Sequence, residues 1–181
     1  MRFATDNNGL LLDLPAVASA GQTTLAGSLI FGIGTQSNNQ PVAASVLTTS
    51  SAGYITTVLS GRSFSSSFID SGSNAMFFDS STLAPCPVGG AGDGFYCPAS
   101  VTALTATLRG ANAVTANMSF SVVSAASLFA DRTLSVLPTL AGPIGSRRVL
   151  DWGLPFFYGR RVFYGIEGQT TPMGNGPFYA F

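Results

Sequence analysis

Residues 67–78 read Ser-Phe-Ile-Asp-Ser-Gly-Ser-Asn-Ala-Met-Phe-Phe, and this stretch decides the interpretation of the chain. An apolar segment runs into Asp70-Ser71-Gly72-Ser73, and a second apolar segment follows. A carboxylate is costly to bury unless it is hydrogen-bonded. The turn supplies partners, because backbone N–H groups and the Ser73 hydroxyl can donate to Asp70, and Gly72 permits the backbone geometry required.

An ordinary surface turn is the alternative, since Asp-Ser-Gly is a frequent tripeptide in which Asp70 and Ser71 serve as turn formers. The flanking residues favour an interior position. Phe68-Ile69 precede the turn and residues 75–78, Ala-Met-Phe-Phe, follow it. We therefore single out Asp70 as the candidate functional residue.

The composition excludes several kinds of chemistry. The 181 residues include eight Arg but no Lys, eight acidic residues, two Cys and no His. Without His, the chain alone cannot build a Ser-His-Asp triad, a Cys-His nucleophile or a His-ligated metal centre. A net charge of zero excludes binding that depends on phosphate neutralisation. We expect no cofactor, no metal and no nucleic-acid partner, so acid–base groups come from carboxylates, tyrosines or another chain.

The pattern of short apolar segments, separated by turn signals about every 8 to 12 residues, predicts a single all-β domain over residues 1–181. The predicted strands are Leu10–Leu14, Ser28–Ile33, Val42–Leu47, Tyr54–Leu59, Ser63–Ile69, Met76–Phe78, Leu104–Leu108, Asn117–Val123, Leu150–Gly153 and Arg161–Ile166. One short helix is expected at Ser124–Ala130, with Ser124 as its N-cap. No membrane span is expected, because polar residues interrupt every apolar stretch before about 18 residues.

Cys86 and Cys97 enclose the glycine-rich sequence Pro-Val-Gly-Gly-Ala-Gly-Asp-Gly-Phe-Tyr. This spacing and composition favour a disulfide that closes a loop and stabilises the fold by roughly 3 kcal/mol; two separate buried thiols are the alternative. A bridge indicates an oxidising compartment, so we expect a periplasmic, cell-surface or secreted protein. Asp13 interrupts the N-terminal apolar run, so no clear signal peptide is present.

The stretch Ile69-Asp70-Ser71-Gly72-Ser73 resembles the active-site turn of pepsin-like aspartic proteases. Residues 151–164 resemble a second element of that family, a late strand that threads beneath the turn and precedes an aromatic strand. The resemblance implies that Asp70 is catalytic, that Ser71, Gly72 and Ser73 support it, and that Trp152-Gly153 form the threaded strand. Asp151 departs from the family pattern, which has an apolar residue there, and Ser71 replaces the commoner Thr.

The chain also resembles an uncharacterised bacterial family of the domain-of-unknown-function type, from about Asn7 to Phe181. The shared strings are Phe31–Asn39, Phe68–Asn74, Gly94–Pro98 and Asp151–Phe157. This resemblance implies a pepsin-like fold in which the chain is the C-terminal lobe of a bilobal protein. Because Met1 leads almost directly into a family strand, the chain is expected to be a fragment or a truncated reading frame.

An aspartic protease needs two carboxylates that share one proton and face one water molecule. The single Asp70 turn is therefore half of a site. The second aspartate could come from a missing N-terminal lobe or from a second copy across a two-fold axis, or it could be absent and catalysis lost. We expect an aspartic-endopeptidase-like lobe that cleaves peptides or proteins when paired and is inactive as an isolated monomer. The alternative is a non-catalytic secreted or surface β-domain of the same fold, with a binding or structural role.

Overall fold

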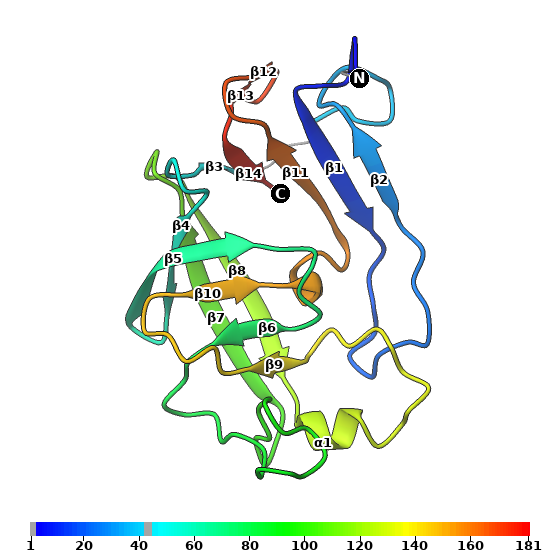
Figure 1. The fold of residues 1–181 in the computed structure, drawn as a ribbon, viewed down its shortest axis with the longest axis vertical. Helices are drawn as coiled ribbons and strands as arrows, with labels where there is room; N and C mark the ends of the chain where they lie inside the picture. The colour runs from blue at the N-terminus through cyan, green and yellow to red at the C-terminus, as the bar shows by residue number, and fades with distance from the viewer. Residues whose placement is uncertain (1–2, 42–44) are drawn as a thin grey trace.

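A computed structural model describes residues 3–41 and 45–181. The fold is nearly all-β, with one short α-helix and one turn of 3₁₀ helix (Figure 1). The strands are β1 (Gly9–Leu14), β2 (Ser28–Phe31), β3 (Val46–Thr48), β4 (Ile55–Leu59), β5 (Arg62–Ile69), β6 (Met76–Phe78), β7 (Thr102–Arg109), β8 (Thr115–Val122), β9 (Ala141–Gly142), β10 (Leu150–Trp152), β11 (Arg160–Gly165), β12 (Thr170–Thr171), β13 (Gly174–Asn175) and β14 (Phe178–Ala180). The helices are α1 (Ala125–Leu128) and η1 (Leu154–Phe156).

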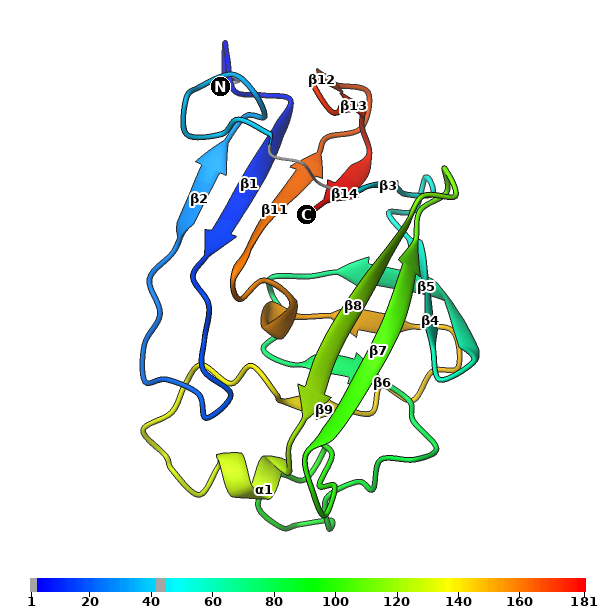
Figure 2. The same cartoon turned by 180° about the vertical axis from the view of Figure 1, so that it is seen from behind.

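Two sheets build most of the molecule. One has five strands in the order β2-β1-β11-β14-β3, and the other has seven in the order β8-β7-β4-β5-β10-β6-β9. The seven-stranded sheet curls into half a barrel, and α1 lies at the end of the molecule opposite the N-terminus (Figures 1 and 2). The short strands β12 and β13 form a separate hairpin.

Side chains that alternate along β1 pack on both faces of the five-stranded sheet. Leu11 is fully buried and packs with Ile33, Phe163 and other residues in a small cluster of its own. Leu12, one residue later, points to the opposite face and packs against the main core. Successive side chains of a strand point to opposite faces, so this sheet separates two apolar regions.

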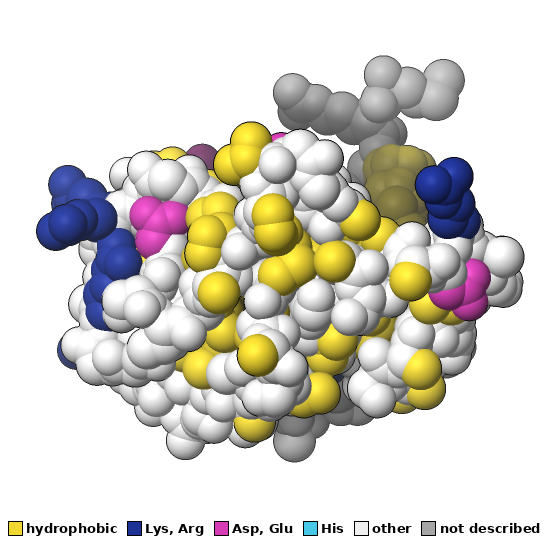
Figure 3. Space-filling model, turned by 90° about the horizontal axis from the view of Figure 1, so that it is seen from below, with side chains coloured by type: hydrophobic (Ala, Val, Ile, Leu, Met, Phe, Trp, Pro, Cys, Tyr) yellow, Lys and Arg dark blue, Asp and Glu magenta, His cyan; other side chains and the backbone are white. Residues whose placement is uncertain are grey.

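The disulfide between Cys86 and Cys97 forms, which confirms the predicted pairing. Cys86 is buried beside Ala125 and Leu128 of α1, and Cys97 packs against the same cluster. The bridge thus fixes the glycine-rich loop against the helical end of the molecule. Figure 3 shows this end from below: scattered hydrophobic side chains lie among uncharged polar ones, and charged side chains lie toward the edges.

The predicted fold class, all-β with one short helix, is confirmed. Each predicted strand overlaps an observed one, although residues 42–44 of the predicted strand Val42–Leu47 lie outside the described residues. The helix is shorter than predicted, and the N-cap hydroxyl of Ser124 donates to Cys97 Sγ at 3.4 Å instead of to the helix backbone. Sequence patterns missed β9, β12, β13, β14 and η1, which have only two or three residues each.

Within residues 3–41 and 45–181, no helix is long and apolar enough to cross a membrane.

Candidate active site

Asp70 begins the turn that joins β5 to β6, and β10 lies between these two strands (Figure 1). β10 pairs in parallel with β5, where Trp152 is opposite Ile69, and antiparallel with β6, where Asp151 is opposite Phe77. A strand far along the chain therefore fills the space between the two strands that carry the Asp70 turn. This arrangement limits the movement of the turn relative to the sheet.

Backbone hydrogen bonds join the turn to β10 and η1. The N–H of Asp70 donates to the Trp152 carbonyl oxygen at 3.0 Å, and the N–H of Leu154 donates to the Ser73 carbonyl oxygen at 2.7 Å. Gly153 lies between these contacts, and a Cβ there would collide with the backbone oxygens of Ala75 and Ser73. The close approach of two backbones explains why glycine occupies this position.

Trp152, on the strand that pairs with β5 and β6, packs in the core next to the Asp70 turn. Its ring is buried, with an edge-to-face contact to Phe120 at a centroid distance of 5.3 Å, and its Nε1 donates to Thr57 Oγ1 at 3.0 Å. A buried indole N–H costs free energy unless it finds an acceptor, and Thr57 provides one. The residue following Asp151 is thus fixed by packing and by a hydrogen bond.

The Asp70 carboxylate is held by its own turn. The N–H of Gly72 donates to Oδ1 at 2.8 Å, and Ser73 Oγ lies 3.0 Å from Oδ2. Asp70 is partly buried, whereas Ser71 and Gly72 are exposed. Both oxygens of the carboxylate therefore have a local partner while the residue remains accessible from the solvent side.

Asp151 lies beneath the turn and contacts the same hydroxyl. Its side chain is 5% exposed, and Oδ2 is 2.6 Å from Ser73 Oγ. The pKa of Asp151 is raised to about 6, mainly by burial; the hydrogen bond from Ser73 lowers this pKa, and the charge of Asp70 raises it. Sequence reasoning noted Asp151 only as a departure from a family pattern and did not place it in the site.

The sequence pattern that singled out Asp70, a carboxylate between apolar residues, also applies to Asp151. Asp151 is a carboxylate between the apolar residues Leu150 and Trp152 of one strand, and all three residues are buried. Such a carboxylate requires a polar partner. The sequence does not reveal that the partner is Ser73, which lies 78 positions earlier.

A pocket of about 310 Å³ opens above Asp70. Its walls are mainly apolar side chains from β1, β2 and the end of β5, with a few polar groups from the turn and from β11. The lining residues are Leu10, Leu12, Leu29, Ile69, Asp70, Ser71 and Tyr164. An apolar cleft with few convergent polar groups is the usual form of a binding site.

Tyr164 lines the pocket, and sequence reasoning did not assign it to the site. Its hydroxyl donates to the carbonyl oxygen of Ile69 at 3.1 Å, one residue before Asp70. Burial raises the pKa of Tyr164, and the charges of Tyr179, Asp70 and Asp151 raise it further. The phenol therefore stays neutral and acts as a hydrogen-bond donor to the strand that presents Asp70.

Comparison with known proteins identifies the family. The family described as "Protein of unknown function (DUF3443)" matches residues 1–181. The chain belongs to this family. Searches of curated proteins and of solved structures found no match to it. Membership of a domain-of-unknown-function family, as expected from the sequence, is confirmed; the family description carries neither a fold nor an activity.

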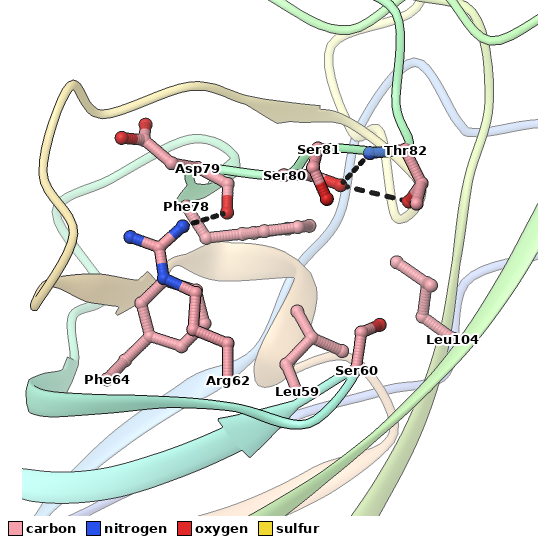
Figure 4. Close-up of a pocket in the computed structure, with 10 residues that line it drawn as sticks. All are labelled: Leu59, Ser60, Arg62, Phe64, Phe78, Asp79, Ser80, Ser81, Thr82 and Leu104. Carbon is pink, nitrogen blue, oxygen red and sulfur yellow. Dashed lines mark hydrogen bonds between the residues drawn. The ribbon is translucent and has the colours of Figure 1, made fainter.

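A second, smaller pocket of this DUF3443 protein, about 60 Å³, is lined by residues of β4, β5, β6 and β7 and of the segment that follows β6. It also contains an aspartate, Asp79, but Figure 4 shows its carboxylate pointing away from Leu59 and Leu104 on the opposite wall. Asp79 Oδ1 accepts the N–H groups of Ile144 and Gly145 at 3.1 and 2.8 Å. This carboxylate closes a loop, so the pocket lacks an acid that faces into it.

Among the described residues, no three Cys, Asp or Glu side chains come together in a cluster that could hold a metal ion.

Proposed function

We propose that the chain is an aspartic-peptidase-like lobe in which Asp70 supplies one carboxylate of a water-activating dyad for peptide-bond hydrolysis. One observation carries this proposal. The Asp70 carboxylate is oriented by Gly72 N–H and Ser73 Oγ at the mouth of a mainly apolar pocket, over a strand that runs between the two arms of its turn. The turn and the strand beneath it support the proposal, because the resemblance to pepsin-like proteases implies both elements.

In this mechanism, Asp70 is paired with a second aspartate, and the two hold one proton between them. The ionised carboxylate takes a proton from a water molecule, which attacks the scissile carbonyl carbon. The protonated carboxyl group donates a hydrogen bond to the carbonyl oxygen. Leu10, Leu12 and Leu29 offer an apolar wall for a hydrophobic side chain of the peptide or protein substrate.

The second aspartate comes from outside the chain in this proposal. Asp151 is the carboxylate nearest to Asp70 through the hydrogen bonds of the turn, but it is buried beneath Ser73 and does not face the pocket. An N-terminal lobe of a bilobal protein or a second copy of the chain would supply the partner. An isolated monomer would therefore be inactive. The disulfide suggests an oxidising extracytoplasmic compartment, where both assemblies are feasible.

The first prediction concerns activity. The complete protein, with any N-terminal lobe, should hydrolyse an unfolded protein substrate at acidic pH. Asp70→Asn should lower kcat/KM by about 10²- to 10⁴-fold, because it removes the general base. The matched control is Asp79→Asn, which changes an aspartate at the end of β6 and should alter kcat/KM by less than about twofold. Equal turnover by wild type and Asp70→Asn would show that Asp70 is not catalytic.

The alternative, a non-catalytic surface β-domain with a binding or structural role, is favoured by one observation. Leu29 and Phe31 are 54% and 47% exposed beside the site, and Phe3 packs on Phe31 at a centroid distance of 5.0 Å. Exposed apolar side chains that gather in one place indicate an interaction surface. Under this alternative, neither wild type nor Asp70→Asn hydrolyses the substrate, and Leu29→Ser changes self-association measured by sedimentation velocity.

A further inference from the structure

One hydroxyl group contacts two carboxyl groups beneath the pocket. Ser73 Oγ lies 3.0 Å from Asp70 Oδ2 and 2.6 Å from Asp151 Oδ2, and both distances are those of hydrogen bonds. A serine hydroxyl has one proton to donate, and an ionised carboxylate has none. Two simultaneous hydrogen bonds therefore require a second proton, which one of the carboxyl groups must carry.

The surroundings indicate which carboxyl group carries that proton. Asp151 is 5% exposed, and its Oδ1 is buried without a hydrogen-bond partner among the described residues. An ionised Asp151 would leave a charged oxygen bare in the interior, whereas the neutral acid leaves only a carbonyl oxygen there. The ion pair found in the described part of the chain joins Arg161 to Asp13, so it compensates neither carboxyl group.

We propose that Asp70 and Asp151 share one proton through Ser73, with Asp151 as the positioning residue of the site. In the resting arrangement, Asp151 Oδ2–H donates to Ser73 Oγ, and the Ser73 hydroxyl donates to Asp70 Oδ2. Transfer along these two hydrogen bonds moves the Asp151 proton to Ser73 while the Ser73 proton moves to Asp70. Asp151 becomes ionised and Asp70 neutral, and no other reactant is consumed.

Among the described residues, two phenols also interact with this pair. Tyr164 from β11 and Tyr179 from β14 approach from the opposite sheet, and burial raises the pKa of each, so both remain neutral where carboxyl groups titrate. The raised pKa of Asp151, about 6, agrees with a proton held on Asp151, the buried member of the three hydrogen-bonded residues. Loss of the proton held at Asp151 should therefore change the environment of both carboxyl carbons.

The decisive measurement needs no variant and no activity. Carboxyl ¹³C signals of the Asp residues would be followed in the full-length protein from pH 3 to 8. We expect the Asp151 signal to titrate near pH 6 and the Asp70 signal to shift in the same step. Independent titration of the two signals, or a fully ionised Asp151 at pH 4, would overturn the proposal.

Variants then test whether the hydroxyl carries the coupling. Asp151→Asn should remove the step near pH 6 from the Asp70 signal, and Ser73→Ala should uncouple the two signals. Ser73→Thr keeps a hydroxyl and should preserve the shared step. Asp131→Asn is the control, because Asp131 is exposed and, among the described residues, its carboxylate accepts hydrogen bonds from Thr133 alone. A shared step that survives in Ser73→Ala would show that charge alone, without the hydroxyl, couples the pair.

The catalytic consequence rests on the proposed function and is tested separately. In the active protein, the pH profile of kcat/KM should lose its limb near pH 6 in Asp151→Asn and retain it in Ser73→Thr. A lower rate with an unchanged profile would reduce Asp151 to a structural residue. If the protein has no peptidase activity, the shared titration step is still expected, so failure of the function and failure of the inference are distinguishable.

Discussion

Asp70 and Asp79 follow two strands that are consecutive in the chain, β5 and β6, but their carboxylates have different roles. Asp79 accepts two backbone N–H groups from a remote loop, those of Ile144 and Gly145. Asp70 accepts one backbone N–H from its own turn, that of Gly72, and its second oxygen meets the shared Ser73 hydroxyl. The first carboxylate connects two parts of the chain, whereas the second faces a pocket.

The difference shows that hydrogen-bond partners, more than residue type or strand position, determine which aspartate is available for chemistry. A carboxylate that accepts backbone donors of a distant segment is committed to the fold, because moving it would break the hydrogen bonds that hold that segment. A carboxylate held by its own turn can remain oriented without closing off its open side. The predictions that follow change one aspartate region and leave the other as control.

The largest effect is expected under the Asp70 turn. Gly153→Ala places a Cβ against the backbone oxygens of Ser73 and Ala75, so the turn or β10 must shift. We expect a loss of about 3 kcal/mol or more in the free energy of unfolding. The matched change beside Asp79 is Gly145→Ala, where φ is +70° and no atom lies within 4 Å. It should cost only about 1–2 kcal/mol, from backbone strain.

Urea denaturation of both variants would measure these values. Similar losses in the two variants would contradict the tight packing that the structure shows beneath Asp70.

The next effect is the pH dependence of stability. Asp151 has an ordinary pKa of 3.8 and a folded-state pKa of about 6, so between these pH values the folded protein holds more protons than the unfolded chain. Stability from this group is complete below pH 3.8 and is lost as the pH rises through about 6. The full difference is up to about 3 kcal/mol.

Unfolding free energies measured from pH 3.5 to 7.5 should show this decrease as the difference between wild type and Asp151→Asn. An Asp151→Asn curve parallel to that of wild type would contradict the raised pKa.

The smallest effect is expected at Asp79 itself. Asp79→Asn keeps an oxygen that can accept from Ile144 and Gly145, but the acceptor is no longer charged. Because hydrogen bonds to charged groups are stronger than neutral ones, the variant should lose about 1 kcal/mol of stability. Faster amide hydrogen exchange confined to residues 144 and 145 would locate the effect. A loss as large as that of Gly153→Ala would show that the Asp79 loop matters more to the fold than its contacts indicate.

Prediction from the sequence succeeded where the signal is local. The strand Met76–Phe78 was predicted with its exact bounds, and the cysteines were paired, because apolar runs and a glycine-rich loop are visible in short windows. It failed for β14, whose residues Phe178–Ala180 form a strand by pairing with β11 and β3. Three residues carry too short a pattern to indicate a strand without knowledge of its partners.

The sequence by itself determined the all-β class, the disulfide and the choice of Asp70 as the candidate residue. Each depends on neighbours in the chain: turn spacing, a loop between two cysteines, and the cost of a carboxylate between apolar segments. Only the tertiary structure decided that Asp151 reaches Ser73 and that the walls of the pocket come from β1, β2 and β11. Sheets join strands that are distant along the chain, so contacts between them cannot be read from local spacing.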